Sequence, residues 1–586
     1  MNVVLFYNEL FTILFMLMAG AVIALDRVKK TAKAEGTAKT VDDVTSGQKK
    51  NSREIYVFLG MLFVAFLLRA WKFGAVPGGM NQDGAMAAVD AKALADYATD
   101  RFGTFLPTHF TAWGYGQMSV LLSYCMVPFI KLFGLNVITA RIPILIASML
   151  GLAALYGIAK KLCGTRAAYV TLAFAVCNPW HFMQSRWALD CNLFPHVLLI
   201  SIWLLLKGLD GKKRWLYFSM VGFALCMYCY GIAFYTVPLL LFGMAGYLLV
   251  KRILKWHEVL ICVAVYAFVA WPIYLTMMIN AFKWNTIKTF FCTMPYFPES
   301  VRSRDILFFS DDKLAQLIKN FQSLKNVYVS GDTLPWNTVP GFGVVTKCFL
   351  PFVLVGTYAC IRQMRSEENS IKKAGYAAAL FFFAIGNLSG LITANVNVNR
   401  VNVLHYALLL MAGLGIDFAV SYLNKRALLI LLAYGIMSVL FVNAYFTEHA
   451  QTLRSNFYAE FLDAVRIAGD EKQTDCRQIV ITPDTQYAGS ASVSEILTLF
   501  ALSVDARFFQ GETVDQYGQS YHEKFHYVNV LPESMDPSLP VAYVIKTVYL
   551  GDQGTELLEE NGFVIKKTNG NGKYCVVIPR ERYLGN

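Results

Sequence analysis

The chain has 586 residues, of which 56% are hydrophobic and 16% are charged, and its net charge is +12. Soluble domains carry about 25% charged residues, whereas apolar runs of roughly 17–25 residues, long enough to cross a bilayer, recur along this chain. The composition excludes an ordinary soluble protein and predicts a polytopic α-helical membrane protein. Most of the positive charge lies in short loops, where it orients helices, so it does not indicate a nucleic-acid partner.

The first apolar run, 3–25, is followed by a polar linker that is rich in Lys and Arg and extends to Arg53. The positive-inside rule places this linker in the cytoplasm and the extreme N-terminus outside. A signal peptide is the alternative, but the run lacks a basic leading region and a clear cleavage site with small residues. We therefore predict a membrane helix, after which 55–71 crosses outward.

The run 118–133 is apolar enough to span the membrane, but the charge pattern argues against a crossing. If it crossed, the basic clusters at 160–166, 207–214 and 251–255 would all lie outside. A helix that lies along the external interface puts every one of these clusters inside, in agreement with the positive-inside rule. We therefore predict an interfacial helix at 118–133 in a large first external loop.

With that choice the chain makes about twelve crossings, and both termini lie outside. The predicted spans are 3–25, 55–71, 142–159, 167–179, 193–206, 216–230, 232–250, 259–279, 344–361, 374–393, 401–423 and 427–446.

The tail, 447–586, is more highly charged and has short β-branched runs at 479–481, 541–548 and 576–578, a helical pattern at 492–502 and a hairpin turn at 569–572. About 140 residues is a normal domain size. We expect an N-terminal helix and linker (1–54), a transmembrane domain (55–446) and an external α/β domain (447–586). A disulfide between Cys476 and Cys575 remains open.

Four charged residues are predicted at the external face. Asp83 follows the second helix, and its alternative role is that of a helix N-cap for 85–97. Arg186 and Asp190 are four residues apart, a spacing that on a helix allows an ion pair; a purely structural pair is the alternative. Arg400 follows three alternating Asn residues, which suggest an extended segment at the membrane surface.

The planar guanidinium of Arg400 suits a phosphate, although an interfacial anchor is the alternative. Together the two carboxylates and two guanidinium groups suit chemistry on a substrate with a lipid tail and a phosphate head. They lie near external loops rich in aromatic residues, namely Trp113, Tyr115, Trp284, Tyr296 and Trp336. Asp83 and Asp190 could share a divalent cation, but no ligand-rich cluster requires one. We find neither a Walker-type motif nor a dinucleotide-binding glycine pattern.

From Ile55 to Phe446 the chain resembles the bacterial GT-C membrane glycosyltransferases of the protein O-mannosyltransferase and aminoarabinose-transferase type. The matching segments are 81–91, 100–103, Pro107, 113–117, 180–192 with its Ser-Arg-x-x-x-Asp element, 336–343 and 399–402. The chain departs from the family at Gly84, because many members carry Glu after the first Asp.

The resemblance implies transfer of a sugar, a hexose or a pentose, from a polyprenyl-phosphate donor to an acceptor hydroxyl, with inversion. It assigns the catalytic base to Asp83, an assisting role to Asp190, and the lipid phosphate to Arg400 with help from Arg186. The reaction would occur on the extracytoplasmic face of a bacterial inner membrane, with membrane lipids as further partners and an unknown glycan, lipid or protein as acceptor. The alternatives are a transporter or flippase of lipid-linked sugars, a ligase or polymerase of lipid-linked glycans, and a non-catalytic assembly protein.

Overall fold

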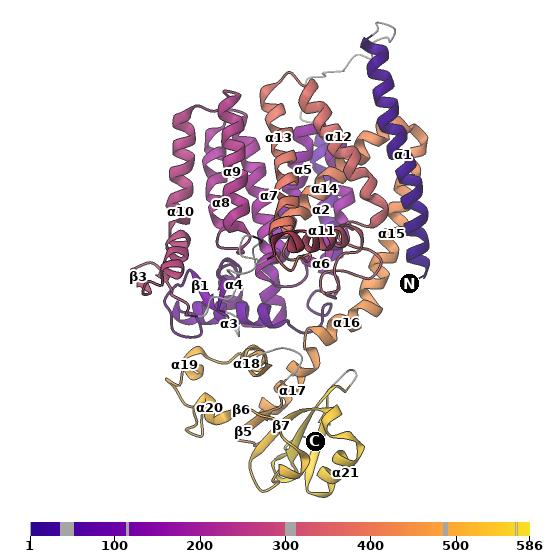
Figure 1. Ribbon diagram of the computed structural model, residues 1–586. Helices are drawn as coiled ribbons and strands as arrows, with labels where there is room; N and C mark the ends of the chain where they lie inside the picture. The colour runs from indigo at the N-terminus through magenta and orange to yellow at the C-terminus, as the bar shows by residue number, and fades with distance from the viewer. Residues whose placement is uncertain are drawn as a thin grey trace.

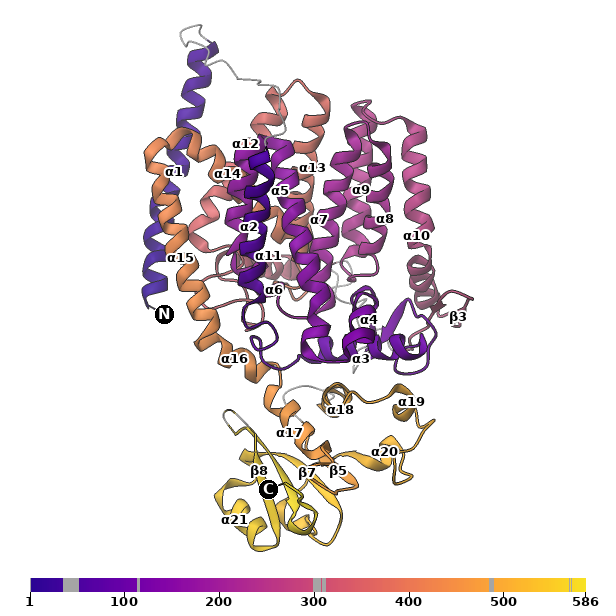
Figure 2. The same ribbon diagram turned by 180° about the vertical axis from the view of Figure 1, so that it is seen from behind.

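The computed structural model describes residues 2–34, 52–112, 116–298, 307, 312–483, 490–568, 570 and 572–585. A bundle of helices runs side by side, and a smaller C-terminal unit lies at one end of it (Figures 1 and 2). The N-terminus lies toward the same end as this unit. Trp113 and Tyr115 of the predicted aromatic set lie outside the described residues.

Within the described residues, seven helical stretches are long and apolar enough to cross a membrane, judged by length and composition. One of these stretches is α5 (Val137–Val176), which is interrupted at Gly164, where φ is 86°. Another contains both α14 (Asn402–Leu423) and α15 (Leu428–Phe446). The remaining five are α1 (Asn2–Ala34), α7 (Asp190–Leu209), α9 (Ala233–Val250), α10 (Trp256–Phe282) and α13 (Ser370–Ile392).

Three further helices coincide with predicted crossings but are shorter or carry charged ends: α2 (Ser52–Ala70), α8 (Lys213–Cys226) and α12 (Leu350–Ser366). Among the described residues, each of the twelve predicted crossings therefore overlaps a helix or one of the two parts of α5. The predicted polytopic helical architecture is confirmed.

Two helices of the segment between α2 and α5 lie at the end of the bundle that faces the C-terminal unit (Figure 1). These are α3 (Gln82–Tyr97) and α4 (Leu121–Phe133), which pack on one another. The 13 residues of α4 reach only ~20 Å, too short for a hydrocarbon core of about 30 Å. This agrees with the prediction from the basic loops that the segment does not cross the membrane. A small hairpin of β1 (His109–Thr111) and β2 (Gln117–Ser119) lies between them in the chain.

The described part of the segment between α10 and α12 contains the two-residue strands β3 (Ile287–Lys288) and β4 (Thr293–Met294) and the helix α11 (Lys313–Val329). The helix lies across the direction of the spanning helices (Figure 1). Between α5 and α7 a short helix, α6 (Pro179–Gln184), is capped by the side chain of Asn178 and is fully buried.

The C-terminal unit begins with α16 (Glu448–Asn456) and α17 (Ala459–Gly469), which lead from the bundle to a five-stranded sheet. Its order is β6 (Phe525–Tyr527), β5 (Gln478–Ile481), β7 (Val541–Lys546), β9 (Tyr574–Pro579) and β8 (Phe563–Lys567).

In this sheet β5 pairs in parallel with β6 and β7, and β9 pairs antiparallel with β7 and β8. The other helices of the unit are α18 (Ser490–Ala501), α19 (Ala506–Phe509), α20 (Tyr521–Lys524) and α21 (Gly551–Glu560). The predicted strands and helix agree with β5, β7, β9 and α18. Cys476 and Cys575 are free thiols, and Asn569 and Asn571 of the predicted hairpin turn lie outside the described residues.

Candidate active site

Asp83 lies in the first turn of α3, two residues after the N-cap residue Asn81. The side-chain Oδ1 of Asn81 accepts a hydrogen bond from the backbone N–H of Gly84 at 2.8 Å, so Asn81 caps the helix. Asp83 is therefore not the N-cap residue of α3. Its side chain is half-buried. The exposed N–H groups and dipole at a helix start favour a negatively charged side chain at this position.

Gly84 brings the start of α3 against the segment that precedes Asp190. A Cβ atom at Gly84 would lie 2.5 Å from the carbonyl oxygen of Ala188, well inside the van der Waals distance. The two backbones therefore meet directly, and Asp83 lies next to the segment 185–190. This contact requires Gly at position 84, because a larger residue would push α3 away from this segment.

Arg186 and Asp190 do not share a helical face. α6 ends at Gln184, 185–189 form a turn and an extended stretch, and α7 begins at Asp190 with Leu189 as its N-cap in a β conformation. The predicted i, i+4 arrangement is therefore wrong, because it assumed an unbroken helix. Asp190 is 5% exposed, and its Oδ1 accepts a hydrogen bond from the N–H of Cys191 at 2.7 Å.

The guanidinium of Arg186 is fully buried and points toward the end of α2. It donates hydrogen bonds of 2.5–3.3 Å to the carbonyl oxygens of Leu68, Arg69, Trp71, Lys72 and Val76. A guanidinium has five N–H donors, and these carbonyls account for all of them. The Cζ atom of Arg186 also lies 5.0 Å from the centre of the Phe446 ring. Arg186 thus holds the backbone that leads toward Asp83.

Arg141, which the sequence analysis missed, holds the next part of the same segment. Its side chain is fully buried and donates to the carbonyl oxygens of Pro77 at 2.8 Å and Gly79 at 2.6 Å. The signal that could have found it is an arginine inside an apolar run, where a charge is costly unless it has partners. Arg141 and Arg186 together fix most of the turn between α2 and α3.

Arg400 lies in a turn just before α14 rather than in an extended segment. Asn395 has a left-handed backbone (φ 52°), and the side chain of Asn397 accepts a hydrogen bond from the N–H of Arg400 at 3.0 Å. The Nη1 group of Arg400 donates to the carbonyl oxygen of Ala394 at 3.0 Å. The predicted extended lead-in is therefore wrong: the asparagines are turn residues, which tolerate a left-handed backbone and hydrogen-bond to it.

Two residues that sequence reasoning missed hold this turn at Val398. Oδ2 of Asp332 accepts from the N–H of Val398 at 2.8 Å, and Nε2 of His405 lies 2.8 Å from its carbonyl oxygen. Asp332 also accepts from Leu334 N–H and from Asn337 Nδ2. Burial raises the pKa of the Asp332 carboxyl, and these hydrogen bonds oppose that effect. A single Asp in a loop gives no sequence signal for such a role.

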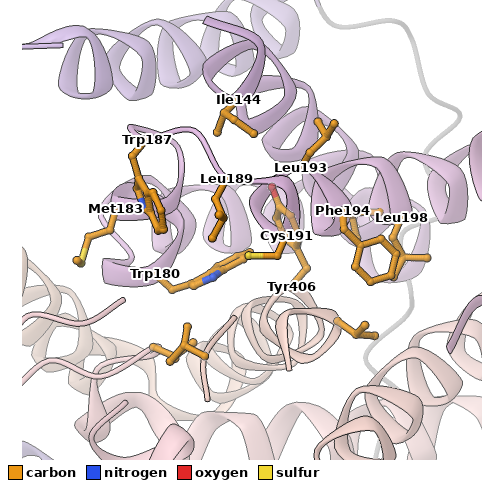
Figure 3. Close-up of a cluster of buried hydrophobic side chains, with 14 of the residues drawn as sticks. Ile144, Trp180, Met183, Trp187, Leu189, Cys191, Leu193, Phe194, Leu198 and Tyr406 are labelled. Carbon is orange, nitrogen blue, oxygen red and sulfur yellow. The ribbon is translucent and has the colours of Figure 1, made fainter. Parts of the chain in front are cut away.

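The starts of α7 and α14 are joined directly. Nδ2 of Asn402 donates to the carbonyl oxygen of Cys191 at 2.6 Å. Cys191 directly follows Asp190, and Asn402 lies two residues after Arg400. Figure 3 shows Trp180, Leu189 and Cys191 gathered with Tyr406 of α14 in the apolar cluster at this junction. The fold therefore brings together the segments of Asp83, Asp190 and Arg400, which are far apart in the sequence.

The acidic groups available to a metal ion are few. Among the described residues, no group of three or more His, Cys, Asp or Glu side chains is arranged to hold a metal ion. Asp83 and Asp190 would offer a divalent cation two carboxylates, so the substrate or water would have to complete its coordination.

Comparison with known proteins agrees with this architecture. Residues 118–279 match the family model described as dolichyl-phosphate-mannose-protein mannosyltransferase. No curated protein matches the chain. Two crystal structures of ArnT from Cupriavidus metallidurans, in the apo state and bound to undecaprenyl phosphate, are similar, with 13% and 12% sequence identity and TM-scores of 0.50 and 0.51. Both comparisons cover 90% of this chain and 98% of ArnT.

The oligosaccharyltransferase of Archaeoglobus fulgidus in its apo form is also similar, with 11% identity and a TM-score of 0.45 over 77% of this chain and 64% of that chain. The likeness to ArnT, together with the membrane-length helices, shows that the protein is a polytopic membrane protein with the GT-C fold. The match over 118–279 and the likeness in fold to ArnT agree with the family resemblance noted in the sequence.

Proposed function

We propose that this protein transfers a sugar from a polyprenyl-phosphate-linked donor to an acceptor hydroxyl. The observation that carries this proposal is the convergence of three distant segments: Gly84 packs against Ala188, and Asn402 hydrogen-bonds to Cys191. Two carboxylates and a guanidinium, those of Asp83, Asp190 and Arg400, belong to these segments. The GT-C fold and the family match over 118–279 support the reaction class.

In the proposed reaction Asp83 accepts the proton of the acceptor hydroxyl as the hydroxyl oxygen attacks the anomeric carbon. The bond between that carbon and the phosphate oxygen breaks, and its electron pair leaves with the lipid phosphate. Arg400 stabilises the charge that develops on the phosphate, and Asp190 orients the reacting groups. A single displacement inverts the anomeric centre.

In this proposal Arg186 positions the backbone and does not help Arg400 to bind the lipid phosphate, a role that the family resemblance implied. Its N–H groups are occupied by carbonyl oxygens around the end of α2, so we assign it to positioning the segment before Asp83. Lipid-phosphate binding is then left to Arg400. The basic loops predict that the site and the C-terminal unit face away from the cytoplasm.

The test compares the purified full chain with Asp83→Asn, using radiolabelled polyprenyl-phosphate hexoses and pentoses and a membrane extract as the source of acceptor. A general base contributes about 10²–10⁴-fold, so we expect transfer by Asp83→Asn to fall by at least about 100-fold. Asp96→Asn is the matched control, because Asp96 lies on the same helix in an ion pair with Lys92.

Asp96→Asn should retain activity, because a surface pair contributes little. Transfer that survives in Asp83→Asn would remove Asp83 as the base. A wild-type protein that folds and moves the intact lipid donor across vesicles without cleaving it would replace the proposed reaction with transport.

A further inference from the structure

Four buried polar side chains from four helices form a single chain of hydrogen bonds among the helices that carry the candidate site. Nδ1 of His181 lies 2.8 Å from Nη2 of Arg69, and Nε2 of His181 lies 2.8 Å from the hydroxyl oxygen of Tyr406. The same hydroxyl lies 2.8 Å from Nδ1 of His196. All four side chains are fully buried, and ionisable groups inside a membrane bundle are rare and tend to mark functional positions.

Arg69 fixes the direction of this chain. A guanidinium stays protonated and has only donors, so Nδ1 of His181 accepts and the ring carries its proton on Nε2. That N–H donates to the hydroxyl oxygen of Tyr406, and the hydroxyl donates to Nδ1 of His196. His196 then carries its proton on Nε2, which has no hydrogen-bond partner within the described residues. The chain therefore ends inside the protein, which favours a positioning role over a path for protons.

Two members of the chain lie in helices that begin at or just after a site residue. His196 lies six residues after Asp190, the first residue of α7, and Tyr406 lies six residues after Arg400, in the second turn of α14. Six residues of a helix rise about 9 Å. The hydrogen bond between Tyr406 and His196 therefore joins α7 and α14 within two turns of the candidate site.

The other two members connect the segments around Asp83. Arg69 is the last residue but one of α2, whose end leads to Asp83, and its Nη1 also donates to the carbonyl oxygen of Val176 at the end of α5 at 3.1 Å. His181 lies in α6, which ends directly before the segment 185–190 that packs against the start of α3. The chain thus connects α2, α6, α7 and α14, so the segments of all three proposed site residues converge on it.

Gly151 of α5 leaves room for the central hydroxyl. A Cβ atom at this position would collide with the hydroxyl of Tyr406 and would lie 2.9 Å from Nδ1 of His196. The indole of Trp180 packs on the same tyrosine with 5.3 Å between the ring centres, and Figure 3 shows both residues in the apolar cluster. The hydroxyl is therefore confined between its two histidine partners and α5.

We propose that Tyr406 is a positioning residue for sugar transfer: its two hydrogen bonds set how the segments of Asp83, Asp190 and Arg400 lie relative to one another. The inference rests on the proposed function, because it assigns Tyr406 to that reaction. Hydrogen bonds fix both distance and direction, whereas apolar contacts are non-directional. Because a shift of about 1 Å at the reacting groups lowers a rate about 100-fold, these two bonds control the rate although Tyr406 is buried.

The first experiment compares the full-length wild type with Tyr406→Phe, which removes only the hydroxyl. Tyr376→Phe is the matched control, because the Tyr376 hydroxyl is also buried and donates to the carbonyl oxygen of Leu162 at 2.6 Å, near the interruption of α5 at Gly164. We expect Tyr406→Phe to lower kcat by about 10–100-fold. The KM for a polyprenyl-phosphate sugar should change less than about threefold, because the Arg400 turn keeps its own hydrogen bonds.

Both tyrosine variants should lower the melting temperature, because each loses a buried hydrogen bond, but Tyr376→Phe should keep the wild-type kcat. An unchanged kcat in Tyr406→Phe would overturn the proposal. An equal fall in kcat in both variants would also overturn it, because the hydroxyl of Tyr406 would then contribute only to general stability.

A second measurement does not depend on sugar transfer. Hydrogen exchange of the full-length protein in nanodiscs follows the amides of 78–84 and 396–402, which contain Asp83 and Arg400. The loss of buried hydrogen bonds should speed local opening by about tenfold in both segments of Tyr406→Phe, and Tyr376→Phe should exchange like the wild type. Wild-type exchange in Tyr406→Phe would refute the coupling. A wild type that transfers no sugar would instead refute the proposed reaction, and the exchange rates separate the two failures.

Gly151→Ala is a second variant that keeps all four side chains of the chain and displaces the hydroxyl of Tyr406. It should speed exchange in the same two segments and lower kcat. Gly435→Ala should do neither, because no described atom lies within 4 Å of a Cβ at that position. Wild-type behaviour of Gly151→Ala would show that the position of the hydroxyl does not control the site.

Nitrogen NMR of protein labelled with 15N-histidine tests the direction of the chain. The signals of His181 are identified by their loss in His181→Gln. We expect a proton on Nε2 and none on Nδ1, because Nδ1 accepts from Arg69. A proton on Nδ1 would show that Arg69 does not donate to this ring and would overturn the proposed chain.

Discussion

Arg186 and Arg400 carry the same functional group near the candidate site, but their hydrogen bonds differ. Arg186 is fully buried and saturated by carbonyl oxygens around the end of α2, whereas Arg400 is half-buried and is held mainly by its own turn. A buried guanidinium with such partners acts as structural support, and its removal leaves polar groups without hydrogen bonds.

We expect Arg400→Ala to raise the KM for the lipid donor by about 10–100-fold without changing the melting temperature, because a charged hydrogen bond to phosphate is lost. Arg186→Ala should instead unfold the end of α2 and lower the melting temperature. Arg186→Lys should not restore the melting temperature, because an ammonium group cannot reproduce the planar set of N–H donors of a guanidinium. Donor titrations and thermal melts in detergent separate the two effects. A stable Arg186→Ala protein with only a weakened donor affinity would reassign Arg186 to the phosphate.

Gly84 gives a second test at the level of one residue. An Ala in a helix usually stabilises by about 1 kcal/mol over Gly, but here its Cβ would collide with the carbonyl oxygen of Ala188. We therefore expect Gly84→Ala to reduce transfer strongly by moving Asp83 away from Asp190. Gly435→Ala, where nothing lies within 4 Å, is the control and should be neutral. Full activity of Gly84→Ala would show that the close approach is dispensable.

At the scale of elements, the loop between α11 and α12 is coupled to the start of α14. Asp332 makes this connection through Val398, and His405 holds the other side of the same peptide unit. The Arg400 turn is therefore held by the loop between α11 and α12 and by α14 together. Residues that touch no substrate can thus control donor binding.

We expect Asp332→Ala to raise the donor KM by several-fold to about tenfold while kcat changes little, because one buried hydrogen-bond network is lost and the turn loosens. The exposed neighbour Thr333 provides the control Thr333→Ala. Steady-state kinetics at varied donor concentration measures the separation between KM and kcat. An equal loss in kcat and kcat/KM would instead place Asp332 in the chemical step.

For the whole molecule, the C-terminal unit docks on the segment at the end of α3. The hydroxyl of Tyr97 donates to Oδ2 of Asp505 at 2.7 Å, Gln510 donates to the carbonyl oxygen of Arg101 at 3.0 Å, and Phe102 packs on Phe509. The N–H of Met80 also donates to the carbonyl oxygen of Phe457 at 2.7 Å. Because Met80 is three residues before Asp83, docking and the candidate site share one stretch of backbone.

Tyr97→Phe and Asp505→Asn should each weaken docking, with a coupling of about 0.5–1 kcal/mol in a double-mutant cycle because the pair is partly solvated. Hydrogen exchange of the α19 amides in the wild type, the single variants and the double variant would measure this coupling energy. Burial alone would raise the pKa of Asp505, but hydrogen bonds from Tyr97 and from the backbone hold it below its usual value. The contribution of the ionised Asp505 carboxylate to docking is therefore complete at neutral pH and is lost only as the pH falls below about 4. Additive single effects would contradict the coupling.

The sequence by itself determined the membrane class, the positions of most helices of the bundle and the presence of a C-terminal unit with a sheet. These features depend on the length of apolar runs and on the positions of Lys and Arg, which are local properties of the chain. It also located Asp83, Asp190 and Arg400, although their catalytic roles remain proposals.

Only the tertiary structure decided which groups these residues meet. The break between α6 and α7 separates Arg186 from Asp190, and the partners of Arg186 are carbonyl oxygens more than 100 positions earlier. Asp332 likewise meets Val398 across 66 positions of the chain. Contacts of this kind depend on how distant backbones pack, and no local pattern of residue types encodes that packing.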